Sequence, residues 1–458
     1  MSPKMIEPKK QEVFCTKDKG YRGFWYGCTK LDNEYAYKYS GGLGTYCAKH
    51  IPFAVYSKKA QKTFFCYGGT NNPDNRGEKH LLHMVSYYDH KKHIVPRPTI
   101  LLDKWCADGH DNPVISIDGQ GYIWIFSSSH GQGTTPSYIH KSCKPFSIDE
   151  FETVSETLYS YPQVKYIKKK GFIFFHTCYD RGRRFIRFTK SKDGFNWDKK
   201  KMLSRIEAGH YQVSSGNSQK IGTFLNYHPE NRAIHGLDLR TNLYYLESKD
   251  FGESWQNIEG ESLELPLLNV DNPALIYDFA REDLKIYLKD MVYDYQNNPV
   301  LLFLSSNGFE PGPQKGPRNW HTVRWNGSQW EFSKICSSDS NYDMGSLYIE
   351  EKDKWKVIAP TKSGPQLFNP GGEVEIWVSN NQGETWDRKT QLTRNSRKNQ
   401  TYIRRPVNAH PQFYAFWADG HGRKPSASCL YFTNQTGTDV WQLPFEMTEK
   451  YQQPKKMG

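Results

Sequence analysis

The strongest constraint on the fold is a layout of segments that recurs along the chain. The segment "HDNPVISID" (110–118) is echoed by "VDNPALIYD" (270–278), and each is followed by a turn and a second apolar strand. Five more segments, near residues 41, 161, 210, 341 and 404, repeat the order of polar opening, apolar strand, turn and apolar strand. A spacing of roughly 50 to 70 residues fits one four-stranded antiparallel blade per repeat. We therefore expect an all-β protein, a single-domain seven-bladed β-propeller.

Composition and turn motifs favour the same fold. The chain is 15% aromatic, with 30 Tyr, 36 Gly and 25 Pro, which is typical of strands and turns. Three turns resemble Asp boxes, each pinned by a Trp, and we expect them to fold hairpins at the outer edges of blades without a catalytic role: "SKDGFNW" (191–197), "SKDFGESW" (248–255) and "SNNQGETW" (379–386). We expect the propeller to span 20–445, between a polar N-terminal extension (1–19) and a C-terminal tail (446–458).

Charge and cysteine usage limit the partners and the compartment. The net charge of +12 favours an anionic partner, but the basic residues are scattered and match no nucleic-acid module, so we expect no nucleic acid. There is no apolar span long enough for a membrane and no signal-like N-terminus, which indicates a cytosolic protein or a trimmed leader. Nine cysteines, an odd number without a C-x-x-C pair, predict buried thiols and no local zinc motif.

Two histidines bracket the apolar hairpin in "HDNPVISIDGQGYIWIFSSSHG". If Asp118 pairs with Tyr122 across the turn, the antiparallel register places His110 opposite His130. The two imidazoles would then be neighbours at one end of one hairpin. This spacing predicts a paired-histidine site, while two separate histidines that cap loops remain the alternative.

The other strand openings are also rich in His, Tyr and Arg. Innermost strands of a propeller start around one central funnel, so these residues are expected to converge on a site. The alternative is that each satisfies hydrogen bonds between blades, or caps a turn as Asn112 or Asp343 would. The candidates are Asn112, Tyr161, His176, Tyr179, Arg181, Arg183, His210, Tyr211, His228, Arg240, Tyr342, Asp343, Arg404, Arg405 and His410.

This set of residue types suits elimination better than hydrolysis. A glycosidase usually needs two carboxylates, and the openings offer only Asp111, Asp271 and Asp343. A β-elimination on a uronate instead needs a cation on the carboxylate, a base for the proton alpha to it, and an acid for the departing glycosidic oxygen. Arginine supplies the first, and His or Tyr supplies the other two. No cofactor is required, although a structural zinc or calcium ion stays open.

Several motifs together resemble one family. The combination of "YSGGLGTY", "HDNP", "DGQGYIWIFSSSHG", "YPQ", "HYQVS", "RTNLYY" and "NYDMGSLYIE" is similar to the BNR-type seven-bladed propeller polysaccharide lyases, which include ulvan lyases and rhamnose–glucuronate lyases. The resemblance covers about residues 20 to 445 and implies cleavage between rhamnose and a uronic acid. It also implies an anionic polysaccharide partner, a monomer without membrane association, and a secreted or periplasmic location.

The resemblance assigns roles to residues of this chain. His110 and His130 match the family's histidine pair, which orients substrate and shares proton transfer. Tyr161, with Tyr211 as a competitor, matches the tyrosine that acts as base or acid. The family's arginine is expected about sixteen residues after the tyrosine, where this chain has His176 and Thr177. We therefore expect Arg183 to neutralise the carboxylate; the expected substrate-binding residues are Asn112, Arg181, His210, Arg240, Tyr342, Arg404 and Arg405.

Two other classes remain open. A related propeller group hydrolyses terminal rhamnose from glucuronate with one histidine on the opposite face, and His50 in "TYCAKH" is the candidate for that role. A non-catalytic glycan-binding propeller is the other. Sialidases also carry Asp boxes, but "YIRRPV" (402–407) matches their arginine motif poorly.

Overall fold

The computed structural model describes residues 13–72, 80–131, 135–230 and 238–457, and this part of the chain is almost entirely β-structure. Its helices are single 3-10 turns: η1 (Gly109–Asp111), η3 (Phe279–Glu282) and η4 (Pro313–Lys315). In the described ranges, no helix has the length and apolar character needed to cross a bilayer. The all-β prediction is confirmed.

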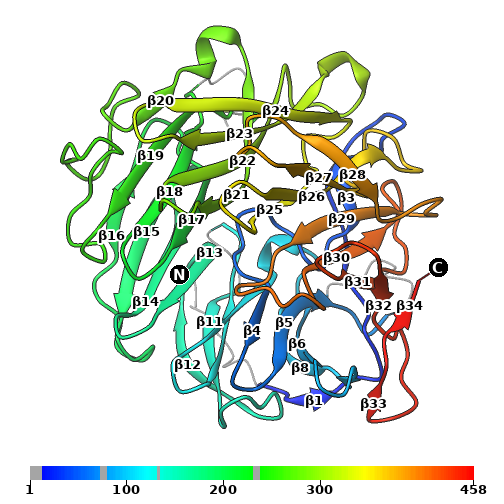
Figure 1. Cartoon of the computed structure of the whole chain (residues 1–458). Helices are drawn as coiled ribbons and strands as arrows, with labels where there is room; N and C mark the ends of the chain where they lie inside the picture. Colours follow the sequence, from blue (N-terminus) through cyan, green and yellow to red (C-terminus); the bar gives the residue numbers. More distant parts are fainter. Residues whose placement is uncertain (1–12, 73–79, 132–134, 231–237, 458) are drawn as a thin grey trace, which may run out of the picture.

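Groups of four antiparallel strands follow one another along the chain and are arranged around a centre (Figure 1). The first group is β4 (Ala54–Ser57), β5 (Lys62–Gly69), β6 (Leu82–Asp89) and β8 (Thr99–Asp103), with β1 (Thr16–Lys17) on its edge. The next two are β9 (Pro113–Ile117), β10 (Ile123–Ser127), β11 (Ser137–Ser142) and β12 (Phe151–Thr157), then β13 (Ser160–Ile167), β14 (Gly171–Asp180), β15 (Arg183–Ser191) and β16 (Lys201–Ser204). Two more are β17 (Gln212–Gly216), β18 (Ile221–Tyr227), β19 (Thr241–Ser248) and β20 (Leu275–Tyr277), then β21 (Lys285–Tyr293), β22 (Pro299–Ser306), β23 (Arg318–Trp325) and β24 (Trp330–Ser338).

The last sheet combines two such groups. They are β25 (Ser346–Ile349), β26 (Trp355–Ser363), β27 (Gly372–Ser379) and β28 (Asp387–Gln391), then β29 (Asn399–Arg404), β30 (Ala415–Gly420), β31 (Leu430–Thr433) and β32 (Val440–Gln442), with β34 (Lys455–Lys456) on the edge. The two groups are joined by one pair, Gly372 with Gln400. The described strands therefore form these four-stranded groups, the last two of which share one sheet, and the number of seven blades stays a prediction.

Two short pairs lie outside the main groups. The hairpin of β2 (Trp25–Lys30) and β3 (Tyr37–Gly42) precedes the first group, and β33 (Tyr451–Gln452) pairs with β7 (Val95–Pro96). The predicted division into 1–19, 20–445 and 446–458 stays a prediction. Within the described residues, strands of both outer segments pair with the propeller, β1 with β8 and β33 with β7.

The middle strands carry continuous apolar runs because blades pack against each other on both faces. In β22 (Pro299–Ser306) every residue is buried, as expected for a strand covered on two sides. The three Asp-box turns lie between the third and fourth strands of their groups. In the turn after β19, Asp250 accepts hydrogen bonds from the backbone N–H groups of Glu253 and Ser254, and Trp255 is buried. These turns are structural, as the sequence predicts.

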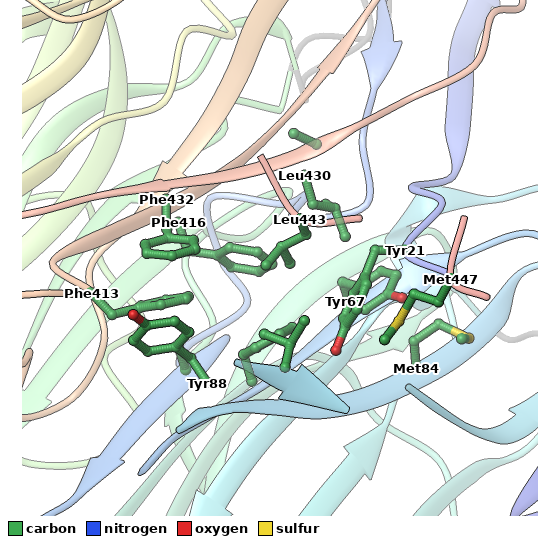
Figure 2. Close-up of a cluster of buried hydrophobic side chains, with 14 of the residues drawn as sticks. Tyr21, Tyr67, Met84, Tyr88, Phe413, Phe416, Leu430, Phe432, Leu443 and Met447 are labelled. Atoms are coloured by element: carbon green, nitrogen blue, oxygen red, sulfur yellow. The ribbon is translucent and has the colours of Figure 1, made fainter. Parts of the chain in front are cut away.

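A cluster of buried side chains closes the ring without a covalent link. Figure 2 shows Tyr67, Met84 and Tyr88 of the first group against Phe413, Phe416 and Phe432 of the last, with Leu443 and Met447 beside them. The rings of Phe413 and Phe432 stack at 4.4 Å between centroids. In Figure 1 the last strands (red) accordingly lie beside the first (blue). The chain's beginning and end are therefore held together by apolar packing.

The structure corrects two of the predicted blade openings. The segment at 270 leads into β20, the outermost strand of its group, and the inner strand of the next group is β21, which begins at Lys285. The segment at 404 is the end of inner strand β29, which begins at Asn399. Both segments have the expected apolar pattern. That pattern does not distinguish the start of an inner strand from its end or from an edge strand.

Candidate active site

A cavity of about 210 Å³ lies where the inner strands begin. Its walls come from residues between Cys28 and Tyr402, and thus from most of the groups around the ring. The lining contains seven tyrosines, five lysines or arginines, two histidines and a single carboxylate, that of Asp238. Sequence reasoning therefore identified both the location and the residue types of this cavity, which we call the tyrosine pocket.

The two histidines of the predicted pair are stacked in this pocket. The register of β9 and β10 is the predicted one, with Ile115 opposite Ile125 and Pro113 opposite Ser127. Beyond these strands, the rings of His110 and His130 lie parallel, with centroids 4.0 Å apart and an angle of 17° between their planes. The hairpin thus delivers both imidazoles to one wall, as its spacing predicts.

One carboxylate orients both rings. Asp108 caps η1 by accepting a hydrogen bond from the backbone N–H of His110, and its two oxygens contact the two imidazoles separately. Oδ1 lies 2.5 Å from Nδ1 of His110, and Oδ2 lies 2.7 Å from Nδ1 of His130. An ionised carboxylate only accepts hydrogen bonds, so each Nδ1 carries a proton and donates it to Asp108.

The charges of this trio follow from its surroundings. Burial alone would raise the pKa of Asp108, but His110 and His130 more than offset it and hold that pKa well below its usual range. Burial lowers the pKa of His110 to about 4, even though Asp108 opposes the shift. At neutral pH the pocket therefore contains an ionised Asp108 and a neutral His110.

Tyrosine hydroxyls meet the free nitrogen of each ring. Nε2 of His110 lies 2.5 Å from the Tyr46 hydroxyl and 3.0 Å from the Tyr39 hydroxyl. Nε2 of His130 lies 3.3 Å from the Tyr161 hydroxyl. Burial raises the pKa of Tyr161 well above its usual value, so this hydroxyl keeps its proton at neutral pH. Each imidazole is thus placed between a carboxylate and a phenol, an arrangement that can pass protons.

Arg184, and not the predicted Arg183, supplies a cation next to this group. Nη1 of Arg184 donates to the Tyr211 hydroxyl at 2.6 Å, and the guanidinium lies 6.0 Å from the centre of the Tyr161 ring. Arg183 is partly exposed and pairs with Glu230 outside the pocket. In the β14–β15 hairpin Tyr179 faces Arg184 whereas Asp180 faces Arg183, and neighbouring residues of a strand point to opposite faces. The structure also places the predicted Arg181 outside the pocket, since it lies exposed at the tip of this hairpin.

A second arginine enters the pocket as predicted. The guanidinium of Arg240 lies over the rings of Tyr287 and Tyr211, at 4.5 and 4.8 Å from their centres. Tyr342 lines the same wall and stacks on Tyr39 at 4.3 Å. Tyr211 therefore lies between two guanidinium groups, Arg184 and Arg240.

Two predicted binding residues serve the fold instead. The Asn112 amide donates to the carbonyl oxygens of Leu43 and Tyr46, which fixes the loop that carries Tyr46. His210 is fully buried, and its Nδ1 donates to the carbonyl of Asn226 while Nε2 accepts from the backbone N–H of Ile206. Both side chains follow the polar opening of a strand, but they point into the contacts between blades and do not line the pocket.

Arg404 and Arg405 lie away from the tyrosine pocket. They stand at the end of β29, and they line a different cavity with Asp290. On β29 the residue that lines the tyrosine pocket is Tyr402, and Arg404 follows it by two residues, about 7 Å further along the strand. His50, the candidate for the hydrolase reading, is completely buried and does not line the tyrosine pocket.

Several residues of the pocket escaped sequence reasoning. Tyr39 and Tyr46 belong to the quoted "YSGGLGTY" motif but were not singled out as site residues, and the buried lysines Lys49 and Lys289 were not singled out either. Asp108, behind the histidines, lies outside the recognised strand openings. The sequence carries one local signal for Asp108, which precedes His110 by two residues, the spacing of a side chain that caps a short turn.

The same trio is also the one group of potential metal ligands found among the described residues. One ligand atom from each of Asp108, His110 and His130 lies within 4.8 Å of the others. The stacked rings point both Nδ1 atoms at the two oxygens of one carboxylate, a geometry that two N–H donors satisfy.

The pocket's charge distinguishes between reaction classes. Five lysines or arginines line it, and the single lining carboxylate among the described residues, Asp238, forms an ion pair with Lys38. Asp108 lies behind the histidines and is occupied by them. No pair of free carboxylates faces the cavity within the described residues, so the acid and base of a two-carboxylate glycosidase are missing from this wall.

Comparisons with known proteins agree with this fold. The chain is 25% identical over 312 residues to an ulvan lyase of Nonlabens ulvanivorans, which covers 61% of this chain and 64% of that protein. It is 24% identical over 316 residues to the "Ulvan Lyase-PL25" of Pseudoalteromonas sp. (strain PLSV), covering 60% of this chain and 62% of that protein. The match thus spans less than two thirds of either relative.

Solved structures extend the likeness to nearly the whole chain. A PL25 ulvan lyase superposes with a TM-score of 0.70 at 16% identity, over 91% of this chain and 96% of that one. The same lyase bound to -[GlcA(1-4)Rha3S]- gives 0.69 at 15% identity, over 93% and 96%. Residues 75–338, more than half of the chain, match the model of the BNR repeat-containing family. The chain belongs to the BNR repeat-containing family.

Proposed function

We propose that this protein is a polysaccharide lyase that cleaves a rhamnose- and uronate-containing anionic glycan, of the ulvan type, by β-elimination. The observation that carries the proposal is the placement of Arg184 beside the Asp108–His130–Tyr161 chain in a pocket whose described residues include no free carboxylate pair. Relatives that are themselves ulvan lyases, and the glycan bound by one structural neighbour, support the same substrate class.

The first requirement of the reaction is a neutralised carboxylate. Arg184 is held by Tyr211 and is buried, so its charge acts in a poorly solvated site where electrostatic interactions are strong. A uronate carboxylate paired with this guanidinium makes the proton alpha to it easier to remove, because the negative charge that develops on the carboxylate is stabilised. Arg240 adds a second positive charge on the far side of Tyr211.

The proton transfers then use one histidine and one tyrosine. Nε2 of His130 takes the alpha proton, and the imidazolium is stabilised by Asp108 at 2.7 Å. The Tyr161 hydroxyl gives its proton to the departing glycosidic oxygen as the carbon–oxygen bond breaks and the double bond forms. The resulting tyrosinate and imidazolium are 3.3 Å apart, so one proton transfer between them restores both groups. His110, between Asp108 and Tyr46, holds the stack and the substrate in place.

Each role in this step is filled by a side chain of the chain itself, so the proposal requires no cofactor. A polymeric substrate is encountered outside the cell, and we accordingly propose a secreted or periplasmic enzyme that acts as a monomer. The partner is the anionic polysaccharide.

The test is the ultraviolet absorbance of an unsaturated uronate during incubation with ulvan and other uronate glycans. We expect absorbance to rise with the wild type and with His50→Ala, and to be lost with His130→Ala. Release of rhamnose without new absorbance would instead favour hydrolysis, and retained binding without cleavage would leave a glycan-binding propeller. Either outcome would contradict the lyase proposal.

A further inference from the structure

A second cavity, of about 230 Å³, lies further along the same inner strands. We call it the far cavity. Three inner strands carry or adjoin residues of both cavities. Lys165 on β13 follows Tyr161 by four residues, Ser215 on β17 follows Tyr211 by four, and Arg404 on β29 follows Tyr402 by two. Two to four residues of a strand span about 7 to 13 Å, so the two cavities follow one another along the propeller axis. Lys289 lines both.

The far cavity is rich in positive charge. Four cations line it, Lys165, Lys289, Arg404 and Arg405, against one carboxylate, Asp290. That carboxylate is fully engaged. It accepts from Nε and Nη2 of Arg405 at 3.2 and 3.1 Å, and from two backbone N–H groups at 2.9 and 3.0 Å. Asp290 therefore neutralises Arg405 and has little capacity left for the other cations.

Two of the remaining cations lack an anionic partner in the described part of the chain. Arg404 is 4% exposed; its Nη2 donates to the carbonyl of His50, but its buried Nη1 has no hydrogen-bond partner. Lys165 lines the cavity and forms no ion pair or side-chain hydrogen bond with another described residue. Burial and the neighbouring Arg405 lower the pKa of Lys165 to about 8, as expected where positive charge is in excess.

Buried donors without partners are costly, so this arrangement favours a bound acceptor. We propose that the far cavity is a binding site for a small oxyanion, sulfate or phosphate, held between Arg404 and Lys165. The cavity has room for a tetrahedral oxyanion, and Ser215 and Ser346 lie in its wall. The site is separate from the proposed catalytic residues, and its existence does not depend on the lyase activity.

The expected consequence is stabilisation of the folded ring. An anion that binds only the folded chain raises the unfolding temperature as its concentration increases. The experiment is thermal unfolding of the full chain in sodium sulfate, compared with sodium chloride of equal ionic strength. Sodium phosphate and sodium glucuronate form separate arms. We expect sulfate and phosphate to raise the unfolding temperature by about 2 to 5 °C, and glucuronate, a bulkier carboxylate, to do so less.

Two variants locate the effect. Lys165→Met removes a cation that has no partner in the fold, and we expect it to abolish the shift in sulfate. Arg184→Gln is the matched control in the tyrosine pocket, and we expect it to keep the shift. Lys165→Gln serves as the second variant if Lys165→Met fails to fold in chloride.

Three results would overturn the proposal. The first is the absence of a sulfate-specific shift in the wild type. The second is a shift that disappears in Arg184→Gln and persists in Lys165→Met, which would place the anion in the tyrosine pocket. The third is a shift that persists in both variants, which would place it elsewhere on the surface.

Discussion

The shared carboxylate of Asp108 provides the sharpest test of the proposed chemistry. Asp108→Asn keeps the shape of the side chain but leaves one oxygen as an acceptor, so its amide N–H₂ group faces one of the two imidazoles. That ring must then accept at Nδ1 and carry its proton on Nε2, where the proposed base needs a lone pair. The imidazolium that forms in the reaction also loses its counter-charge.

The size of the effect follows from the loss of one of the two contacts, which are 2.5 and 2.7 Å long. A hydrogen bond to a charged group contributes about 1.5 to 3 kcal/mol, so the loss of one raises the barrier by about 1.5 to 3 kcal/mol. At 1.36 kcal/mol per factor of ten, kcat/KM should fall by about 10- to 100-fold. The assay is the initial rate of uronate absorbance on ulvan.

The matched control is Asp118→Asn, at the turn of the same hairpin. Asp118 accepts from the backbone N–H groups of Gln120, Gly121 and Tyr122, far from the imidazoles. This variant should lose about 1 kcal/mol of stability and keep its kcat/KM. A kcat/KM of Asp108→Asn within about threefold of the wild type would refute the proposed role of the carboxylate.

Three further predictions concern the arginine, the buried histidines and the ring closure. Arg184→Gln should lower kcat/KM by about 100-fold or more, whereas Arg183→Gln, which breaks a surface ion pair, should stay within about twofold; equal losses would contradict the assignment. Burial lowers the pKa of His210 to about 4, so as the pH falls the unfolded chain protonates this residue at a higher pH than the folded chain does. As the pH falls from about 6.5 to 4, this residue should remove about 3 kcal/mol of stability, and urea unfolding of His210→Gln should show a weaker pH dependence. Phe413→Ala should lower the free energy of unfolding by about 3 to 5 kcal/mol, measured by denaturant titration; a loss below about 1 kcal/mol would show that the cluster does not hold the ring.

The sequence predicted the fold and one wall of the site because both depend on strand periodicity. The hairpin register placed His110 opposite His130 from the turn alone, since the side-chain period of a strand is two residues. Tyr161 and Tyr211 were found by the same reasoning, because they stand at the beginning of an inner strand or next to it, and Arg240 lines the same pocket from just before the start of β19, the third strand of its group.

What could not be predicted depends on single-residue shifts and on irregular loops. Arg183 and Arg184 are neighbours, and only the hairpin pairing of Asp180 with Arg183 decides which one faces the pocket. Arg404 follows the start of its strand by five residues, and the apolar pattern does not mark that start. Asp108 and Tyr46 belong to loops whose positions depend on tertiary contacts, which no local pattern encodes.

The closure of the ring by apolar packing sets the order in which the tyrosine pocket can form. This pocket takes its walls from residues as far apart as Cys28 and Tyr402, while the cluster that seals the ring needs Phe413, Phe432 and Met447. During synthesis the first blades therefore emerge with Tyr67 and Met84 uncovered, and the pocket has no complete wall until the last strands arrive. Chains that are halted or clipped before these strands would lack a complete pocket and be prone to aggregate through the exposed face. A complete pocket is therefore expected only in chains whose last strands have docked.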